Sequence, residues 1–235
     1  MRVIMQAADV RLNYNHLIQA AIYQNVSHNL ANFLHERGFI YGKRHFKLFT
    51  FSRLLGHYNS VERGIISFDS EIDLYISSPI ERFVREIANS ILRRGHLILG
   101  DSILKVIGLE FPKEPEIGNE VRISMLSPVT VYSTLLTCEL KKKTYYYSPY
   151  EVEFCELIDL NAKKKHVILH NKKIKSHLTI IPIKVREVIV MYKDTVVKSW
   201  LGSFYLKGPK TLIRTLYDTG LGSKNSQGFG MFTVT

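Results

Sequence analysis

The sequence predicts an α+β protein made of two similar halves, each a sheet with helices packed against it. Three observations support this prediction. Short apolar runs typical of strands alternate with longer runs of helical periodicity. A stretch containing Pro112, Pro115, Gly118 and Asn119 then interrupts the pattern and is typical of a linker. Beyond it the order of strands and helices repeats more loosely, and the chain closes on a glycine-rich stretch.

The first half combines strand-like runs with two amphipathic helices. The first helix begins at His16, and apolar residues recur every three or four positions up to a C-cap at Arg37–Gly38. The second opens at Pro79 and ends at Gly95. Strands are expected at Arg2–Ala8, Lys47–Leu55, Gly64–Phe68, Ile72–Ile76 and His96–Phe111. This order of strands and helices is the ferredoxin-like plan.

The second half repeats this plan with different residues. Its helices are expected to open at Ser148–Pro149 and Gly208–Pro209, with Lys163–Lys165 as the basic end of the first. Strands are expected at Val121–Ser133, Tyr145–Tyr147, Leu178–Met191, Thr195–Leu206 and Met231–Val234. The sequence therefore predicts two tandem ferredoxin-like, or RRM-like, domains at residues 1–115 and 119–235.

Composition indicates a polyanion as the partner. The 235 residues carry a net charge of +11, which favours nucleic acid first and an acidic membrane surface second. No run approaches the roughly 18 apolar residues of a membrane span. We expect a cytoplasmic protein, because charges at Asp9 and Arg11 interrupt any export signal. Cys138 and Cys155 are interpreted as reduced, and the scattered histidines predict no metal site.

The glycine-rich stretch, residues 220–230, is the most informative part of the chain. It is neither a dinucleotide fingerprint nor a P-loop, because the third glycine is misplaced and no Gly-Lys-Ser or Gly-Lys-Thr occurs. One interpretation is a hairpin that closes a sheet. The other is a loop that grips a polyanion through its backbone amides. Its glycines and central polar residues are Gly220, Gly222, Lys224, Asn225, Ser226, Gly228 and Gly230.

Two Gly-hydrophobic-Gly pairs around a short polar stretch with a lysine resemble the C-terminal loop of the RAMP proteins. More narrowly, they resemble the CRISPR-associated endoribonucleases that cut precursor CRISPR RNA within its repeats. Three further contexts are similar to this family: Tyr23 in Ala-Ile-Tyr-Gln-Asn, His35 in Phe-Leu-His-Glu, and Lys47 opening Lys-Leu-Phe-Thr-Phe-Ser. The segment Glu36–Phe46 is longer than the resemblance predicts. It adds His45, which is the alternative to His35 as the catalytic histidine.

The resemblance implies a metal-independent endoribonuclease without a cofactor. Its nucleophile would be the 2′-OH beside the scissile phosphate, and its products a 5′-hydroxyl and a 2′,3′-cyclic phosphate. Such chemistry needs a base, an acid and a cation, which histidine, tyrosine and lysine supply. The implied partners are CRISPR repeat RNA and other CRISPR effector subunits, with the chain a monomer or homodimer. The RNA would contact the glycine loop, and Lys210 and Arg214 beside it.

A distance argument constrains the site. On one straight helix, the twelve residues from Tyr23 to His35 would separate the two side chains by roughly 18 Å. One phosphate cannot contact both at that separation. The sequence therefore predicts a helix break near Val26–Asn29, with Ser27 capping a second short helix.

Plainer interpretations stand beside the catalytic one. Alone, Tyr23 is a packing tyrosine, His35 a surface residue near a helix end, and Lys47 a surface lysine. A non-catalytic RAMP subunit that only holds CRISPR RNA would not need the trio. A tandem RRM-like mRNA binder would carry the alternating aromatic pattern of such domains, which the sequence lacks.

Overall fold

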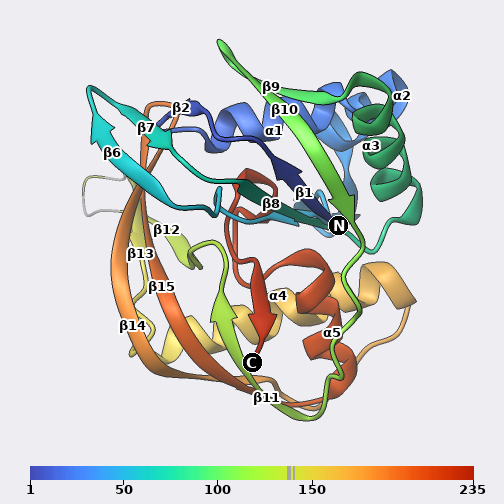
Figure 1. Cartoon of the computed structure of the whole chain (residues 1–235). Helices are drawn as coiled ribbons and strands as arrows, with labels where there is room; N and C mark the ends of the chain where they lie inside the picture. Colours follow the sequence, from blue (N-terminus) through green and yellow to red (C-terminus); the bar gives the residue numbers. More distant parts are fainter. Residues whose placement is uncertain (137–138, 140) are drawn as a thin grey trace.

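The computed structural model describes residues 1–136, 139 and 141–235. The N-terminal half, blue to green in Figure 1, lies above the C-terminal half, yellow to red. The linker after β10 runs down one side of the molecule to β11. No helix within these described ranges is both long enough and apolar enough to span a membrane.

The N-terminal half is built on one antiparallel sheet with strand order β5-β8-β1-β10-β9. Helices α1 and α3 bury their apolar faces in the same core as the sheet, with Ile18 and Phe83 fully buried. The elements of this half are β1 (Arg2–Met5), β2 (Asp9–Arg11), α1 (Asn15–Gln24), α2 (His28–Asn32), η1 (Phe33–Arg37), β3 (Phe39–Tyr41), β4 (Arg44–Phe46), β5 (Thr50–Phe51), β6 (Tyr58–Glu62), β7 (Ile65–Phe68), β8 (Ile72–Ser77), α3 (Glu81–Arg94), β9 (His96–Leu99) and β10 (Ser102–Glu110).

The C-terminal half is built on a second antiparallel sheet with strand order β14-β15-β11-β16. Its own apolar core joins this sheet to α4 and α5, with Phe154, Phe204 and Leu212 fully buried. The elements of this half are β11 (Glu120–Met125), β12 (Tyr132–Leu136), β13 (Lys142–Tyr146), α4 (Val152–His170), β14 (Thr179–Tyr192), β15 (Thr195–Lys207), α5 (Lys210–Thr219), η2 (Asn225–Gln227) and β16 (Phe232–Val234).

The α+β class is confirmed, and one strand order occurs twice. In the N-terminal half β1, β5, β8 and β10 alternate with α1 and α3; in the C-terminal half β11, β14, β15 and β16 alternate with α4 and α5. Both sheets place these strands in the order second, third, first, fourth. The two halves therefore share one arrangement of strands, and each has the core described above.

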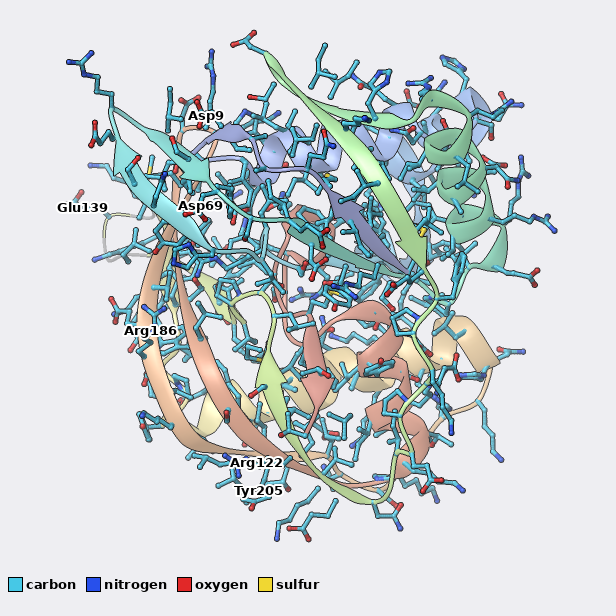
Figure 2. The ribbon with its side chains drawn as sticks, viewed as in Figure 1. Asp9, Asp69, Arg122, Glu139, Arg186 and Tyr205 are labelled. Atoms are coloured by element: carbon cyan, nitrogen blue, oxygen red, sulfur yellow. The ribbon has the colours of Figure 1, made fainter. Side chains whose placement is uncertain are left out.

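Three small sheets are additions that the sequence analysis did not predict. Strands β2, β7 and β6 form one, and the hairpins β3–β4 and β12–β13 form the others. Figure 2 shows Asp9 and Asp69 near the three-stranded sheet, far from the paired residues Arg122 and Tyr205 at the opposite end of the molecule. The β3–β4 hairpin accounts for the unusual length of the segment Glu36–Phe46.

Some predicted boundaries are wrong. The expected strand Lys47–Leu55 is reduced to Thr50–Phe51, because Leu48 has a positive φ of 54° that interrupts the extended backbone. The strand expected at Arg2–Ala8 ends at Met5, and α3 begins at Glu81 rather than at Pro79. These differences shorten the elements without changing their order.

The predicted basic helix end at Lys163–Lys165 is also wrong. Helix α4 continues to His170 and ends where Asn171 adopts a left-handed conformation. The prediction of reduced cysteines concerns Cys138, which lies outside the described residues, and Cys155, whose thiol is free.

The glycine loop, residues 220–230, lies between the two halves. A Cβ atom on Gly228 would lie 2.5 Å from Cε2 of Phe51 in the N-terminal half. One on Gly230, whose φ is +81°, would lie 2.0 Å from the carbonyl oxygen of Leu221. The Thr50 hydroxyl donates to the Phe229 carbonyl at 3.1 Å. The loop therefore does more than close a hairpin, because its backbone joins the halves at distances that exclude side chains.

We expect Gly230→Ala to destabilise the fold far more than Gly64→Ala. Both glycines have a φ near +80°, but a Cβ on Gly64 meets nothing within 4 Å. Gly64→Ala should cost about 1 kcal/mol of unfolding free energy for its conformation alone, and Gly230→Ala at least ~3 kcal/mol because the backbone must move. Urea unfolding of both variants measures the difference. Equal losses would contradict the close approach.

Candidate active site and RNA-binding cleft

The break after α1 is stabilised by α3. Buried Asn25 donates to the Ala21 carbonyl at 2.8 Å and accepts from the Ser90 hydroxyl at 2.8 Å. The backbone N–H of Ser27 donates to Oε2 of Glu86 at 2.7 Å. Helix α1 therefore ends at Gln24, and α2 starts at His28 after a turn. The predicted break is confirmed, and Ser27 is the N-cap residue of α2 as predicted, although its side chain makes no capping hydrogen bond.

Tyr23 and His35 meet because of this break. Their rings are in edge contact, with centroids 6.0 Å apart and an interplanar angle of 77°. Tyr23 also contacts the buried ring of Phe49, with centroids 5.9 Å apart. His35 lies in η1, a wide π-helical turn of a kind often found at functional sites. The Tyr23 ring is half-buried and the His35 ring is exposed, so the pair opens to solvent on one side.

Lys47 reaches the same place from the segment after β4. Its Nζ donates to the carbonyl oxygen of His35 at 2.7 Å. Burial lowers the pKa of Lys47 and raises that of Tyr23 to about 12. At neutral pH the phenol therefore keeps its proton and acts as a donor. The structure thus brings together three side chains that the sequence analysis selected from three separate segments.

His45 occupies a different position. It lies on β4, and its Nδ1 is 2.7 Å from the Arg37 carbonyl. Because a carbonyl only accepts, Nδ1 must carry the proton, which leaves Nε2 available. The described ring contacts pair Tyr23 with His35 rather than with His45. This geometry favours His35, and the assignment of the catalytic histidine stays a prediction.

A cavity of about 290 Å³ extends from Lys47 to the glycine loop. Its wall combines basic residues of the β4 region, residues of α4, one ring of β12 and the loop itself. None of the described lining residues is acidic. The lining residues that carry charge or hydrogen-bonding groups are Arg44, His45, Lys47, Tyr132, Asn161, Lys165, Thr219, Ser223, Lys224, Asn225 and Ser226. Such a wall attracts an anion, since nothing within it neutralises the positive charge.

Lys165 gives the cavity a buried amino group. Its side chain is only 2% exposed, and its Nζ donates to the Gly220 carbonyl and to Oδ1 of Asn225, both at 2.7 Å. Asn225 in turn donates to the carbonyls of Leu221 and Phe229, both at 3.0 Å. Burial lowers the pKa of Lys165 to about 7. Lys165 therefore stabilises the loop from inside, although the sequence analysis assigned it to a basic helix end.

Lys224 in the cavity wall and Lys164, the neighbour of Lys165 on α4, also have lowered pKa values. Nζ of Lys224 lies 5.1 Å from the centre of the Tyr132 ring, a cation–π contact, and burial lowers its pKa. Burial and then the nearby charge of Arg44 lower the pKa of Lys164. Because these cations lie close together, a polyanion would relieve their mutual repulsion.

The structure does not bring Lys210 and Arg214 to this cavity. Lys210 is exposed at the first position of α5. Arg214 forms ion pairs with Glu114 at 2.6 Å and Asp218 at 3.1 Å. Their roles as RNA contacts stay predictions without support from the cavity.

Sequence reasoning missed Tyr132, Asn161 and the loop contacts of α1. Tyr132 and Asn161 had no sequence signal, because they reach the cavity only through tertiary packing. The α1 contacts had one: Asn15 and Gln19 precede Tyr23 at intervals of four residues, which aligns all three on one helix face.

Comparisons with known proteins establish the family of this chain. The family description "CRISPR-associated protein Cas6, N-terminal" matches residues 9–108, and "CRISPR associated protein Cas6, C-terminal" matches residues 111–234. The chain belongs to the Cas6 family. Resemblance to CRISPR-associated proteins, first noted in the glycine loop and the trio, is thereby confirmed.

Relatives of the Cas6 family match along almost the whole chain. The CRISPR-associated endoribonuclease Cas6 1 of Methanocaldococcus jannaschii is 29% identical, over 93% of this chain and 85% of its own length. The CRISPR-associated endoribonuclease Cas6 of Pyrococcus furiosus is 26% identical, over 97% of this chain and 85% of its own length. A solved structure described as CRISPR associated protein Cas6 has a TM-score of 0.79 and 27% identity, covering 100% of this chain and 98% of the other.

We expect the stability contribution of Lys165 to depend on pH. Its folded pKa of about 7 lies below its ordinary value of 10.5, so the unfolded chain binds more protons between these two values. The free energy of unfolding should therefore rise with pH across this window, by at most about 1.4 kcal/mol per pH unit, and stay flat below it. Urea unfolding of the wild type and Lys165→Met from pH 6 to 10 measures this slope.

The control is Lys143→Met, which replaces an exposed lysine. Its unfolding free energy should follow the wild-type pH profile, whereas the profile of Lys165→Met should rise less steeply, with only the contribution of Lys165 removed. Parallel profiles for the wild type and Lys165→Met would show that Lys165 is not buried with a lowered pKa.

Proposed function

We propose that this protein is an endoribonuclease that cuts CRISPR repeat RNA, with Tyr23, His35 and Lys47 as the catalytic residues. The observation that carries the proposal is the convergence of these groups: two rings in edge contact and an ammonium bound to the backbone of one of them. Membership of the Cas6 family and two relatives named endoribonucleases support the substrate class.

The proposed reaction uses the RNA's own nucleophile. His35 accepts the proton of the 2′-OH, and the 2′-oxygen bonds to the adjacent phosphorus. The bond from phosphorus to the 5′-oxygen breaks, and that oxygen takes a proton from a water molecule, which leaves a 2′,3′-cyclic phosphate and a 5′-hydroxyl. The hydroxide left by the water takes the proton held by His35, which restores the base. Tyr23, protonated because its pKa is about 12, donates a hydrogen bond to a phosphate oxygen, and Lys47 stabilises the added negative charge. No step requires a metal ion or another cofactor.

The proposed RNA path runs from this trio into the cavity and along the glycine loop. Lys224, Asn225, Ser226 and the loop glycines would contact the phosphates, with Lys165 fixing the loop from behind. Residues 1–115 and 119–235 would form two ferredoxin-like domains, and the repeated strand order supports this assignment. The protein would act in the cytoplasm, alone or as a homodimer, and could pass its RNA to other CRISPR effector subunits.

We expect His35→Ala to lower the single-turnover cleavage rate of repeat RNA by roughly 10²- to 10³-fold, because it removes the general base. Tyr23→Phe and Lys47→Ala should each lower it about 10-fold or more. His45→Ala should change it less than about threefold, and so should His96→Ala, a partly exposed control on β9. A large loss in His45→Ala with normal cleavage by His35→Ala would reverse the assignment.

Cleavage in EDTA and cleavage of a 2′-deoxy substrate test the reaction itself. We expect full cleavage in EDTA and none when the nucleotide before the cut lacks its 2′-OH. Loss of cleavage in EDTA, or continued cutting of the deoxy substrate, would contradict the proposed reaction. Tight RNA binding without any cleavage would instead support the alternative function, a non-catalytic subunit that holds CRISPR RNA.

A further inference from the structure

One face of α1 carries Asn15, Gln19 and Tyr23, four residues apart. Side chains at this spacing lie above one another, with about 6 Å of rise between successive members. Tyr23 belongs to the proposed catalytic trio, whereas Asn15 and Gln19 contact the C-terminal half. A single helical surface therefore connects the trio with the other half of the molecule.

Gln19 uses both ends of its amide. Nε2 donates to the Ser226 carbonyl of the glycine loop at 2.7 Å, and Oε1 accepts from the hydroxyl of Tyr192 at the end of β14. Since a carbonyl only accepts, the NH₂ group must face Ser226, and Tyr192 must then be the donor. This pairing leaves the amide only one orientation and ties two segments of the C-terminal half to one residue of α1.

Asn15 reinforces the contact one turn earlier. Its Nδ2 donates to the Gln227 carbonyl at 2.9 Å. A Cβ on Gly228 would come within 2.7 Å of the same Nδ2. Glycine at position 228 therefore allows the loop backbone to lie this close to α1, and the two amides oppose its withdrawal.

Tyr192 brings the C-terminal half near the catalytic tyrosine. It is 9% exposed and contacts the His16 ring edge-on, with centroids 6.4 Å apart. After burial, the proximity of Tyr192 is the next cause of the raised pKa of Tyr23. Gln19 thus lies between the loop proposed to hold the RNA and the phenol proposed to act on it.

We propose that Gln19 is a positioning residue that sets the distance between RNA held by the glycine loop and the Tyr23–His35 pair. This inference rests on the proposed function. If Gln19 is lost, the loop and Tyr192 can shift relative to α1, and a misplacement of about 1 Å can cost two orders of magnitude in rate. The loop cations remain, so phosphate affinity is retained. Loss of Gln19 should therefore lower the cleavage rate of bound RNA and leave the affinity for RNA unchanged.

Gln19→Leu removes both hydrogen bonds and keeps the size of the side chain. We expect it to lower the single-turnover cleavage rate at saturating protein about 10-fold or more, with the Kd for repeat RNA changed less than about threefold. Tyr192→Phe, which removes one of the two bonds, should lower the rate by a smaller factor. Gln24→Leu is the matched control, because Gln24 is exposed at the end of the same helix. This variant should cleave at the wild-type rate.

Combining Gln19→Leu with Tyr192→Phe tests whether the residues act as a unit. The double variant should cleave at the rate of Gln19→Leu alone, since the shared bond is already absent. Wild-type rates for Gln19→Leu would overturn the inference, as would a loss of RNA affinity equal to the loss of rate. If the wild-type protein itself fails to cleave, the proposed function fails and this inference with it. Normal wild-type cleavage beside an unaffected Gln19→Leu rejects the inference alone.

Discussion

The close approach of the glycine loop to both halves is the constraint on which the rest of the structure depends. The loop belongs to the C-terminal half, yet its backbone lies against Phe51 and Asn15 of the N-terminal half. Its carbonyl groups accept from side chains of α1, β5 and α4. Backbone N–H groups supply further donors, as Leu221 does to the Gly230 carbonyl at 2.7 Å. Glycine is required here because a Cβ would overlap neighbouring atoms before the donors came within range.

The helix break has a comparable role within the N-terminal half. Two contacts from α3, Ser90 to Asn25 and Glu86 to the backbone of Ser27, hold the chain where α1 ends. The chain then turns back through α2 and η1, so that an imidazole twelve residues away meets the phenol of Tyr23. A continuous helix would have satisfied its own backbone but separated the two rings. The shorter helix α1 is therefore what allows the Tyr23 and His35 side chains to meet.

Electrostatics explain how these parts act together. The described wall of the cavity carries lysine, arginine and histidine but no carboxylate, and several of its lysines have pKa values lowered by burial. Burying cations without counter-ions costs free energy that a bound polyanion can recover. In the proposed function, RNA supplies this missing negative charge next to the catalytic trio. Some basic residues elsewhere are paired with carboxylates, as Arg214 is with Glu114 and Asp218.

The sequence by itself determined the α+β class, the repeated order of elements and the necessity of a break between Tyr23 and His35. Periodicity, turn residues and the fixed rise of a helix are local properties, so they can be recognised without coordinates. Tertiary structure alone decided that Lys165 is buried behind the loop and that Gln19 contacts Ser226 and Tyr192. Those roles depend on segments about 55 to 207 residues apart meeting in space, and no local pattern of charge or polarity specifies which distant partner a side chain will meet.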